Sequence, residues 1–520
     1  MAGPPAKLTL VLLSIAMGAQ ISTAQLAPIK PPPGWPQVPS GTGACSVEKS
    51  CADLAPAMMA GAQGTSPLEK NLGYLTETIG GRLTGSPQAE RAVRWAEDGF
   101  HQARVDDVHI EKFAMPVGWS EGRTHVEILT DSPFPVRLVS VGWSPPTPKG
   151  GITANVMDVG VGDDTSFAKA GAAAQGAIVL VHSELLETWA DLNREYKSDA
   201  EIVGRARGAK VAAIFWMSTR PGHLLYRHTG IVDGHVEPLP QAIVAREDAE
   251  RIAALLASGE KVRVHFDMPN RVTGAVESEN VVAEIRGREK PEEFVLMGAH
   301  LDSWDVGTGA LDDGCGAAVV IDAARVIRAS GSVPRRSIRF VLFTGEEQGT
   351  LGSWAYARAH RAELDHMLAA IIYDGGTGAV TGYSLGGRKD AVAAAREALE
   401  PLAQLGVKNF RTDAAIRTDG FDFMLEGVPT LEPIQEPGNY VLNYHASSDA
   451  FDKVDIPALK KQVGIAAITA YALADAKEPI ALRQSRAEIE QLLNETGLAE
   501  EMKVEGFWAA WASGERGRQP

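Results

Sequence analysis

The stretch FVLMGAHLDSWDVGTGALDDGCG, residues 294–316, decides the fold and the chemistry of this chain. An apolar run of strand type ends at His300, and Asp302 and Asp312 follow it in a glycine-rich loop. Three later segments also carry acidic or imidazole side chains: TGEEQG with Glu346 and Glu347, IIYDGG with Asp374, and NYHASSD with His445. Imidazoles and carboxylates at the ends of successive apolar runs are what a pair of divalent metal ions needs as ligands.

The number of these side chains fits a site for two metal ions. Zinc binds imidazole nitrogen and carboxylate oxygen, and two zinc ions about 3.5–4 Å apart need a carboxylate between them because the cations repel each other. Five side chains can supply this site, with Asp312 as the bridge: His300, Asp312, Glu347, Asp374 and His445. A water in the remaining position between the ions would have a pKa near neutrality, so hydroxide would be available as a nucleophile.

Each segment alone is a weak indication of a metal site. A histidine after an apolar run usually has a structural role, and a Glu-Glu pair usually lies on a solvated face. Here, however, Glu346 and Glu347 follow RRSIRFVLFTG, an apolar strand that ends in glycine, where a surface helix would not begin. Because open α/β sheets place their sites at the carboxyl ends of strands, the segments together predict a metal site.

These segments lie in an alternating pattern of strands and helices. The residue pattern predicts strands at 280–287, 293–300, 337–345, 369–376 and 427–435, and helices at 316–330, 391–405 and 456–476. We therefore expect an α/β fold with a mixed, mostly parallel sheet that is flanked by helices.

The same motifs, taken in this order, resemble the co-catalytic di-zinc exopeptidases of clan MH, which include secreted bacterial aminopeptidases and glutamate carboxypeptidases. HLDSWDVG followed by DDG is most similar to the plasma glutamate carboxypeptidase branch, also called carboxypeptidase Q. The resemblance covers roughly residues 68–121 and 279–475. It implies the zinc exopeptidase fold and two zinc ions per chain.

The resemblance also implies a role for each site residue. One ion would bind Asp312, Glu347 and His445, and the other His300, Asp312 and Asp374. Glu346 would be the general base, although spacing alone cannot distinguish it from its neighbour Glu347. Asp302 would hydrogen-bond His300 and fix its tautomer, and Asp449 is a further candidate for such a supporting role. Tyr444 would stabilise the tetrahedral oxyanion, or else it is a packed or surface tyrosine.

Composition divides the chain into six parts. They are a signal peptide at 1–24, an extended leader at 25–66, the first part of the catalytic domain at 67–122, a β-rich insertion at 123–270, the main catalytic part at 271–478, and a C-terminal helix and aromatic tail at 479–520. The insertion resembles a protease-associated domain, an unrelated β-rich lid being the alternative, and its sequence shows no metal-ligand cluster. We expect the tail motif FWAAW to pack on the body of the protein, contact with a partner being the alternative.

The start of the chain and its composition indicate an exported enzyme. One lysine, a short apolar run and small residues at the cut after Ala24 are typical of a signal peptide, so we expect a secreted or periplasmic protein without a membrane span. The net charge of −16 and the lack of a basic stripe argue against nucleic acid as a partner. Of the three cysteines, Cys45 and Cys51 are the plausible disulfide pair, and Cys315 is expected to be a buried thiol rather than a soft metal ligand.

The favoured function is an exported di-zinc exopeptidase that hydrolyses dipeptides or short peptides through a metal-bridging hydroxide. An aminopeptidase of broad specificity, a non-enzymatic receptor-like binding protein and a single-zinc acyl-transfer enzyme on the same scaffold are the alternatives. A roofed cleft favours short substrates, because a long chain must leave the pocket somewhere. The sequence leaves open the preferred residues at the scissile bond, the terminus that is recognised and the oligomeric state, a homodimer included.

Overall fold

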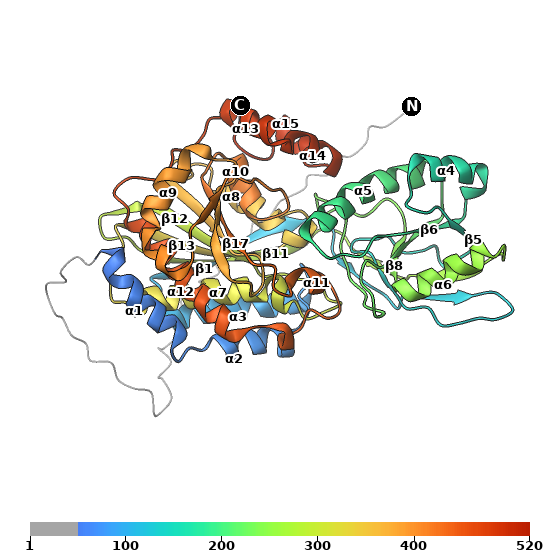
Figure 1. Cartoon of the computed structure of the whole chain (residues 1–520), viewed down its shortest axis with the longest axis horizontal. Helices are drawn as coiled ribbons and strands as arrows, with labels where there is room; N and C mark the ends of the chain where they lie inside the picture. The colour runs from blue at the N-terminus through green and yellow to red at the C-terminus, as the bar shows by residue number, and fades with distance from the viewer. Residues whose placement is uncertain (1–49, 520) are drawn as a thin grey trace, which may run out of the picture. The chain divides into compact units, whose positions relative to one another are not determined.

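An eight-stranded mixed sheet carries the segments of the predicted metal site (Figure 1). The computed structural model describes residues 50–519. The strands follow the order β1 (Asp107–Met115), β11 (Val276–Ile285), β13 (Arg336–Phe343), β12 (Lys290–His300), β14 (Met367–Ile372), β17 (Thr430–Gln435), β15 (Val380–Ser384) and β16 (Asn409–Arg411). The neighbours β13, β12, β14 and β17 are parallel, whereas β1, β11 and β15 each form antiparallel pairs. The predicted mixed α/β fold is confirmed.

The central strands are buried on both faces. Met297 and Phe340 pack in the core on one side of the sheet, and their neighbours Leu296 and Val341 pack in the core on the other side. Successive side chains of a strand point to opposite faces, so a strand that is covered on both sides has a continuous apolar sequence. This is why FVLMGA shows no polar alternation before His300.

Helices cover both faces of this sheet (Figure 1). On one face lie α3 (Pro87–Ala103), α7 (Cys315–Ala329) and α12 (Ile456–Asp475), and on the other α8 (Leu351–Ala359) and α10 (Gly420–Leu425). Further helices of this part are α2 (Leu68–Gly73), α9 (Val392–Ala398) and α11 (Tyr440–Asn443). The helix predicted at 391–405 is shorter than expected: α9 ends before a 3₁₀ segment that begins at Glu400 and has proline in its first turn.

The prediction of an extended leader up to residue 66 is wrong for its last part. Residues Cys51–Gln63 form helix α1, which Ser50 and Asp53 cap with a reciprocal capping box. Side chains such as Leu54 and Met58 are buried, and the helix packs against α7 and α12. Alanine and methionine favour helices, and the many small side chains conceal this apolar face in the sequence.

Besides the first part of the leader, residues 25–49, two earlier predictions lie outside the described residues. The signal peptide at 1–24 is one of them. The other is the Cys45–Cys51 disulfide, because Cys45 belongs to the part of the chain before residue 50. Both therefore stay predictions.

The insertion has a sheet of its own, in the order β3 (His125–Ile128), β9 (Arg263–Asp267), β5 (Ile152–Asp158), β6 (Ile178–Val181), β7 (Ala213–Met217), β8 (Gln241–Val244) and β4 (Leu138–Ser140). A short ribbon of β2 (Trp119–Ser120) and β10 (Arg271–Val272) joins the ends of this segment. Three helices accompany the sheet, α4 (Asp164–Ala170), α5 (Trp189–Gly208) and α6 (Arg246–Ala257), so the segment is α/β rather than β-rich. The charged sequence of α5 conceals its helix, which begins with a capping box at Thr188 and Asp191.

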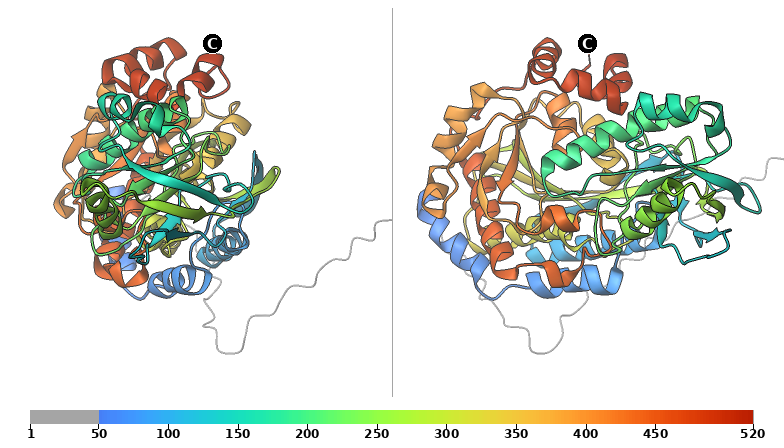
Figure 2. Two further views of the ribbon diagram at one scale, coloured as in Figure 1. Left: turned by 90° about the vertical axis from the view of Figure 1, so that its right-hand side faces the viewer. Right: turned by 45° about the vertical axis from the view of Figure 1, so that its right-hand side comes forward.

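The C-terminal segment forms three helices instead of one helix and a tail: α13 (Arg486–Thr496), α14 (Leu498–Glu505) and α15 (Trp508–Ser513). Phe507 and Trp511 of the FWAAW motif are buried, which confirms the expected packing. Figure 2 shows these helices beside α5 of the insertion, and α14 contacts α5.

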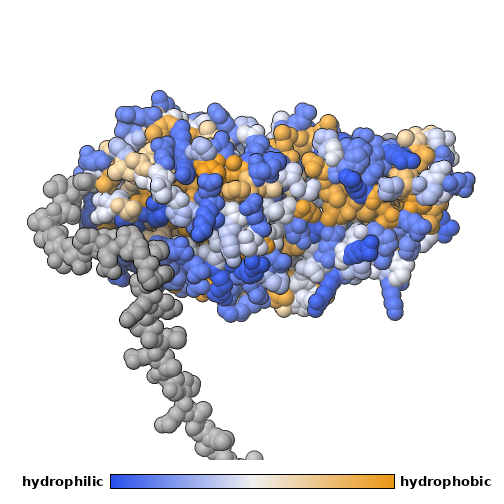
Figure 3. All heavy atoms as spheres, turned by 90° about the horizontal axis from the view of Figure 1, so that it is seen from below, coloured by the Kyte–Doolittle hydropathy of each residue, from blue (hydrophilic) through white to orange (hydrophobic). Residues whose placement is uncertain are grey.

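Exposed apolar side chains are spread over the surface in patches. On the face in Figure 3 the longest run lies over the right-hand part of the molecule, which the insertion forms. None of the described helices combines the length and the apolar content that a bilayer span requires.

Candidate metal centre

Three neighbouring parallel strands, β13, β12 and β14, carry several of the residues singled out in the sequence at or just beyond their carboxyl ends (Figure 1 shows the sheet). His300 is the last residue of β12. Glu346 and Glu347 stand in a 3₁₀ turn just beyond β13, and Asp374 lies just beyond β14. Because β12 lies between β13 and β14, these strand ends adjoin at the edge where open α/β sheets place their sites.

A loop held by the insertion brings His445 over these strand ends. His445 follows α11 and has a left-handed φ of 56°, which non-glycine residues seldom adopt. The main-chain N–H of Arg227 donates to the main-chain oxygen of His445 over 3.0 Å. The guanidinium of Arg220 donates to the main-chain oxygen of Tyr444 over 2.7 Å. The insertion therefore takes part in holding a potential metal ligand.

Asp312, Glu347 and His445 form the first group of potential ligands. His445 Nε2 lies 2.9 Å from Glu347 Oε2 and 3.2 Å from Asp312 Oδ2. All three side chains are buried, and neither Asp312 Oδ2 nor Glu347 Oε1 accepts a hydrogen bond within residues 50–519. Burying a carboxylate oxygen without a hydrogen-bond partner costs folding free energy. A cation bound to these oxygens would offset that cost.

His300, Asp312 and Asp374 form the second group, which shares Asp312 with the first. His300 Nε2 lies 3.1 Å from Asp312 Oδ1 and 3.9 Å from Asp374 Oδ1. The other ring nitrogen, Nδ1, lies 3.0 Å from the main-chain oxygen of Asp302. Because a carbonyl only accepts, Nδ1 carries the proton and Nε2 is left for a metal ion. Tyr440 donates its hydroxyl to Asp374 Oδ1 over 3.0 Å and orients that carboxylate.

The charges of the two groups also fit divalent cations. Burial, and then the charge of Asp312, raises the pKa of Glu347 well above its usual value. Burial and Asp312 likewise raise the pKa of Asp374, although His300 opposes them. Such crowding of buried carboxylates is what bound cations offset, and the nitrogen and oxygen donors are those that zinc prefers. The residues therefore fit a centre of two ions with Asp312 between them.

Glu346 lies beside these groups without belonging to either. It lines the same cavity as Glu347 and His445. Burial raises the pKa of Glu346 well above its usual value, and the carboxylates of Glu347 and Asp374 raise it further against the effect of His300. An uncoordinated carboxyl with a raised pKa is suited to carry protons, so its role as the general base stays a prediction that this geometry allows.

Asp302 contacts His300 through a different atom from the one expected. Its main-chain oxygen makes the hydrogen bond to Nδ1, while its carboxylate Oδ1 lies 3.7 Å away, within ion-pair range but beyond hydrogen-bond length. The carboxylate instead accepts from the hydroxyl of Thr84 over 2.8 Å and from the main-chain N–H of Glu346 over 3.3 Å. Asp302 therefore connects the end of β12 with the turn that carries the acidic pair.

Tyr444 belongs to the cavity beside the metal centre. Its ring stacks on His445 with a centroid separation of 3.7 Å, and its hydroxyl lies 3.2 Å from that of Tyr196 in the insertion. Burial raises the pKa of Tyr444 well above its usual value, so the hydroxyl keeps its proton and can donate it. The cavity that Tyr444 shares with Glu346 has a volume of about 30 Å³, enough to hold a water molecule.

Asp449 supports the loop that carries Asp312. Its carboxylate accepts three main-chain hydrogen bonds, from Ala310 over 3.1 Å, Leu311 over 2.7 Å and Asp312 over 3.2 Å. This agrees with a supporting role. The thiol of Cys315 is buried and belongs to neither group of ligands, as expected.

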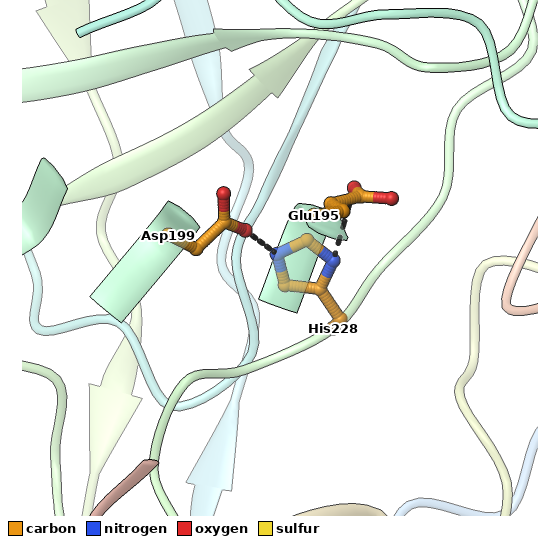
Figure 4. Close-up of side chains that lie close together, drawn as sticks. All are labelled: Glu195, Asp199 and His228. Atoms are coloured by element: carbon orange, nitrogen blue, oxygen red, sulfur yellow. Dashed lines mark ion pairs between the residues drawn. The ribbon is translucent and has the colours of Figure 1, made fainter. Parts of the chain in front are cut away.

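The insertion brings together a third cluster, Glu195, Asp199 and His228, which its sequence did not indicate (Figure 4). His228 Nε2 lies 3.1 Å from Asp199 Oδ2, and Nδ1 lies 3.7 Å from Glu195 Oε1. The ligand atoms of the three residues lie within 4.8 Å of one another, but the two carboxylates face different nitrogens of one ring. We interpret the cluster as an ion-paired support rather than a metal site.

Other residues near the centre were also missed. Tyr440 could have been found, because it stands one helical turn before Tyr444 in YVLNY. Thr84, Arg417 and Asp419 gave no signal, since each comes near the site only through tertiary contacts.

Comparisons with known proteins agree with this geometry. Residues 280–469 match the model of Peptidase family M28. Carboxypeptidase Q of Mus musculus is 31% identical over 414 residues, which cover 79% of this chain and 86% of the mouse protein.

Two solved structures extend the likeness to the fold. The crystal structure of a Peptidase M28 precursor from Shewanella amazonensis SB2B aligns with a TM-score of 0.75 at 29% identity, and covers 84% of this chain and 99% of that chain. BSAP, a zinc aminopeptidase from Bacillus subtilis, aligns with a TM-score of 0.60 at 20% identity over 80% of this chain and 98% of that chain. Because BSAP is only 20% identical, its similarity to this chain shows the fold alone.

Proposed function

Because the chain belongs to peptidase family M28 and is therefore a zinc metallopeptidase of the exopeptidase type, we propose that it binds two zinc ions and hydrolyses dipeptides or other short peptides. The observation that carries the proposal is the sharing of Asp312 between two groups of buried ligands. Such a shared carboxylate is what two adjacent cations require.

Each ion would have three protein ligands. One ion would be held by Asp312, Glu347 and His445, and the other by His300, Asp312 and Asp374. When bound, the two ions would polarise the scissile carbonyl and lower the pKa of the attacking water, so that hydroxide is available near neutral pH.

The protein's own groups would carry the proton and the developing charge. Glu346 takes a proton from the attacking water and passes it to the nitrogen of the leaving amine, which its position beside both groups of ligands supports. The hydroxyl of Tyr444, which stays protonated, donates to the oxygen on which negative charge develops. His300 keeps its tautomer through the main-chain oxygen of Asp302.

The insertion would limit the length of the substrate. Its residues Tyr196 and His228 line the cavity together with Glu346 and His445. At about 30 Å³ this cavity is narrow. A narrow site that the insertion lines favours dipeptides and disfavours long chains.

We further propose that the protein is exported. The support for this is the signal-peptide pattern at residues 1–24, which lies before the described residues. We likewise propose that the insertion is a protease-associated domain. Its separate sheet and its position over the metal centre support this.

Hydrolysis rates on a dipeptide, its N-acetylated form and its C-amidated form test this function. We expect the zinc-loaded protein to cleave the free dipeptide much faster than either blocked form. Unchanged turnover of the acetylated form would identify a carboxypeptidase, and unchanged turnover of the amidated form would identify an aminopeptidase of the kind that BSAP is named for. Either result would remove the dipeptidase proposal.

A further inference from the structure

The cavity beside the metal centre has a single arginine or lysine among the described residues that line it, Arg417. The same cavity is lined by Glu346 and Glu347. With zinc ions on the carboxylate ligands, a substrate carboxylate that is not to compete with the scissile carbonyl for the metals needs a separate cation in this cavity. The position of Arg417 is therefore the place in this cavity where an anionic group of the substrate can bind.

The C-terminal helices hold Arg417 in this position. Its Nε donates to Glu505 Oε2 of α14 over 2.6 Å, and the side chain of Glu505 is only 2% exposed. Arg417 itself has a left-handed φ of 67°, a strained conformation that persists where the surroundings impose it. Within residues 50–519 neither Nη group of Arg417 donates a hydrogen bond. Both Nη groups thus remain available for a ligand.

A tyrosine of the insertion also contacts the guanidinium of Arg417. The Arg417 guanidinium carbon lies 3.8 Å from the ring centroid of Tyr196, a cation–π contact. The hydroxyl of Tyr196 lies 3.2 Å from that of Tyr444, whose ring stacks on the potential ligand His445. Two aromatic rings therefore connect Arg417 with the metal centre.

The ion-paired cluster of Figure 4 explains why Tyr196 stays in place. Tyr196 stands between Glu195 and Asp199 on α5, and its ring lies 5.6 Å from the ring of His228. Glu195 also accepts a hydrogen bond from Tyr226 over 2.5 Å. The cluster thus ties α5 to the segment of the insertion around Tyr226 that holds the His445 loop.

We propose that Arg417 binds the C-terminal carboxylate of the peptide substrate, an inference that rests on the proposed exopeptidase function. A guanidinium whose two Nη groups make no hydrogen bond within the described residues can hold the two oxygens of a carboxylate in a bidentate pair. The C-terminal carboxylate is the one anion that every unblocked peptide carries. Tyr196 offers its hydroxyl to the same group, so residues from the insertion and the catalytic part would together recognise this end of the substrate, while Glu505 of α14 positions Arg417.

The test compares Arg417→Ala and Arg417→Lys with wild type on a dipeptide and on its C-terminal amide. Arg411→Ala is the matched control, because Arg411 has a side chain that is 55% exposed and its nearest acidic partner, Asp413, is 3.9 Å away. We expect Arg417→Ala to lower kcat/KM for the free dipeptide by about 10²-fold, the scale of a lost charge-assisted pair. We expect little change in kcat/KM for the amide. Arg417→Lys should lower kcat/KM for the free dipeptide less than Arg417→Ala, because lysine keeps the positive charge but lacks the paired N–H groups of the guanidinium.

A binding measurement separates this inference from the proposed function. In the Glu346→Gln background, calorimetric titration with the dipeptide and its amide needs no turnover. If the Glu346→Gln protein binds the dipeptide more tightly than its amide, and Arg417→Ala removes this difference, the inference is supported even when hydrolysis is slow. Equal losses for the dipeptide and the amide would mean that Arg417 only docks α14, and would overturn the inference. Failure of zinc-loaded wild type to hydrolyse any of the peptides would instead count against the proposed function.

Discussion

Exchanging the two adjacent glutamates for glutamine, one at a time, should separate catalysis from metal binding. Glu346→Gln keeps the size of the side chain but removes its ability to accept a proton. Because Glu346 stands outside both groups of ligands, metal content should stay close to that of wild type. The loss in kcat should be at least ~10²-fold, the usual scale of general-base catalysis, which corresponds to about 2.7 kcal/mol of activation free energy.

Glu347→Gln should behave in the opposite way. Glu347 Oε2 lies 2.9 Å from His445 Nε2, and both atoms belong to the first group of ligands. Removing the negative charge of a ligand weakens zinc binding by more than the ~10- to 100-fold typical of residues that only support ligands. Zinc occupancy should therefore fall, and excess zinc should restore part of the activity.

The assay is zinc content by elemental analysis together with kcat on a dipeptide, measured on the same preparations. Glu490→Gln, an exposed glutamate of α13, is the control for the chemical change itself. If Glu346→Gln lost zinc while Glu347→Gln kept zinc and lost only turnover, the assignment of the base and the ligand would be reversed and the reasoning refuted.

Three further predictions concern the surroundings of the site. Asp449→Asn should weaken the binding of both zinc ions by ~10-fold or more, because it loosens the loop that carries the shared ligand Asp312; equilibrium dialysis would measure it, and an unchanged affinity would refute the supporting role. The hydrogen bond to Glu111 raises the pKa of His360 although burial lowers it. Below the ordinary histidine pKa of about 6.5 this pair stabilises the fold in full, and the stabilisation is lost as the pH rises through the raised value. His360→Gln should therefore cost about 1 kcal/mol at pH 5.5 and less at pH 9 in urea unfolding, and an equal cost at both values would contradict the pKa shift. Arg516→Lys should destabilise by about 2 kcal/mol and lower kcat, because the buried fork of Arg516 holds the loop just after the acidic pair; unfolding and kinetics that match wild type would exclude this link.

The sequence was most informative where site residues directly follow a buried strand. His300 and the acidic pair stand directly after strands that are covered on both faces, so continuous apolar runs marked both positions. Asp312 and His445 were singled out by residue type alone, because both lie outside the strands in segments whose paths no local pattern determines.

Contacts between distant segments account for what the sequence could not predict. Arg417 takes its position from Glu505, 88 residues later in the chain, and the cluster around His228 forms only when α5 packs against a remote loop of the insertion. Helix α1 was missed for a different reason, since its apolar face consists mainly of alanine and methionine and lacks the bulky periodic residues that mark a helix.

Zinc stoichiometry in the active protein tests the central claim most directly. The mature chain should hold two zinc ions per molecule at full activity, Asp312→Ala should lose both, and His445→Ala should mainly weaken one, because only Asp312 belongs to both groups of ligands. Elemental analysis that found a single tightly held ion in fully active wild type would contradict the two-ion centre.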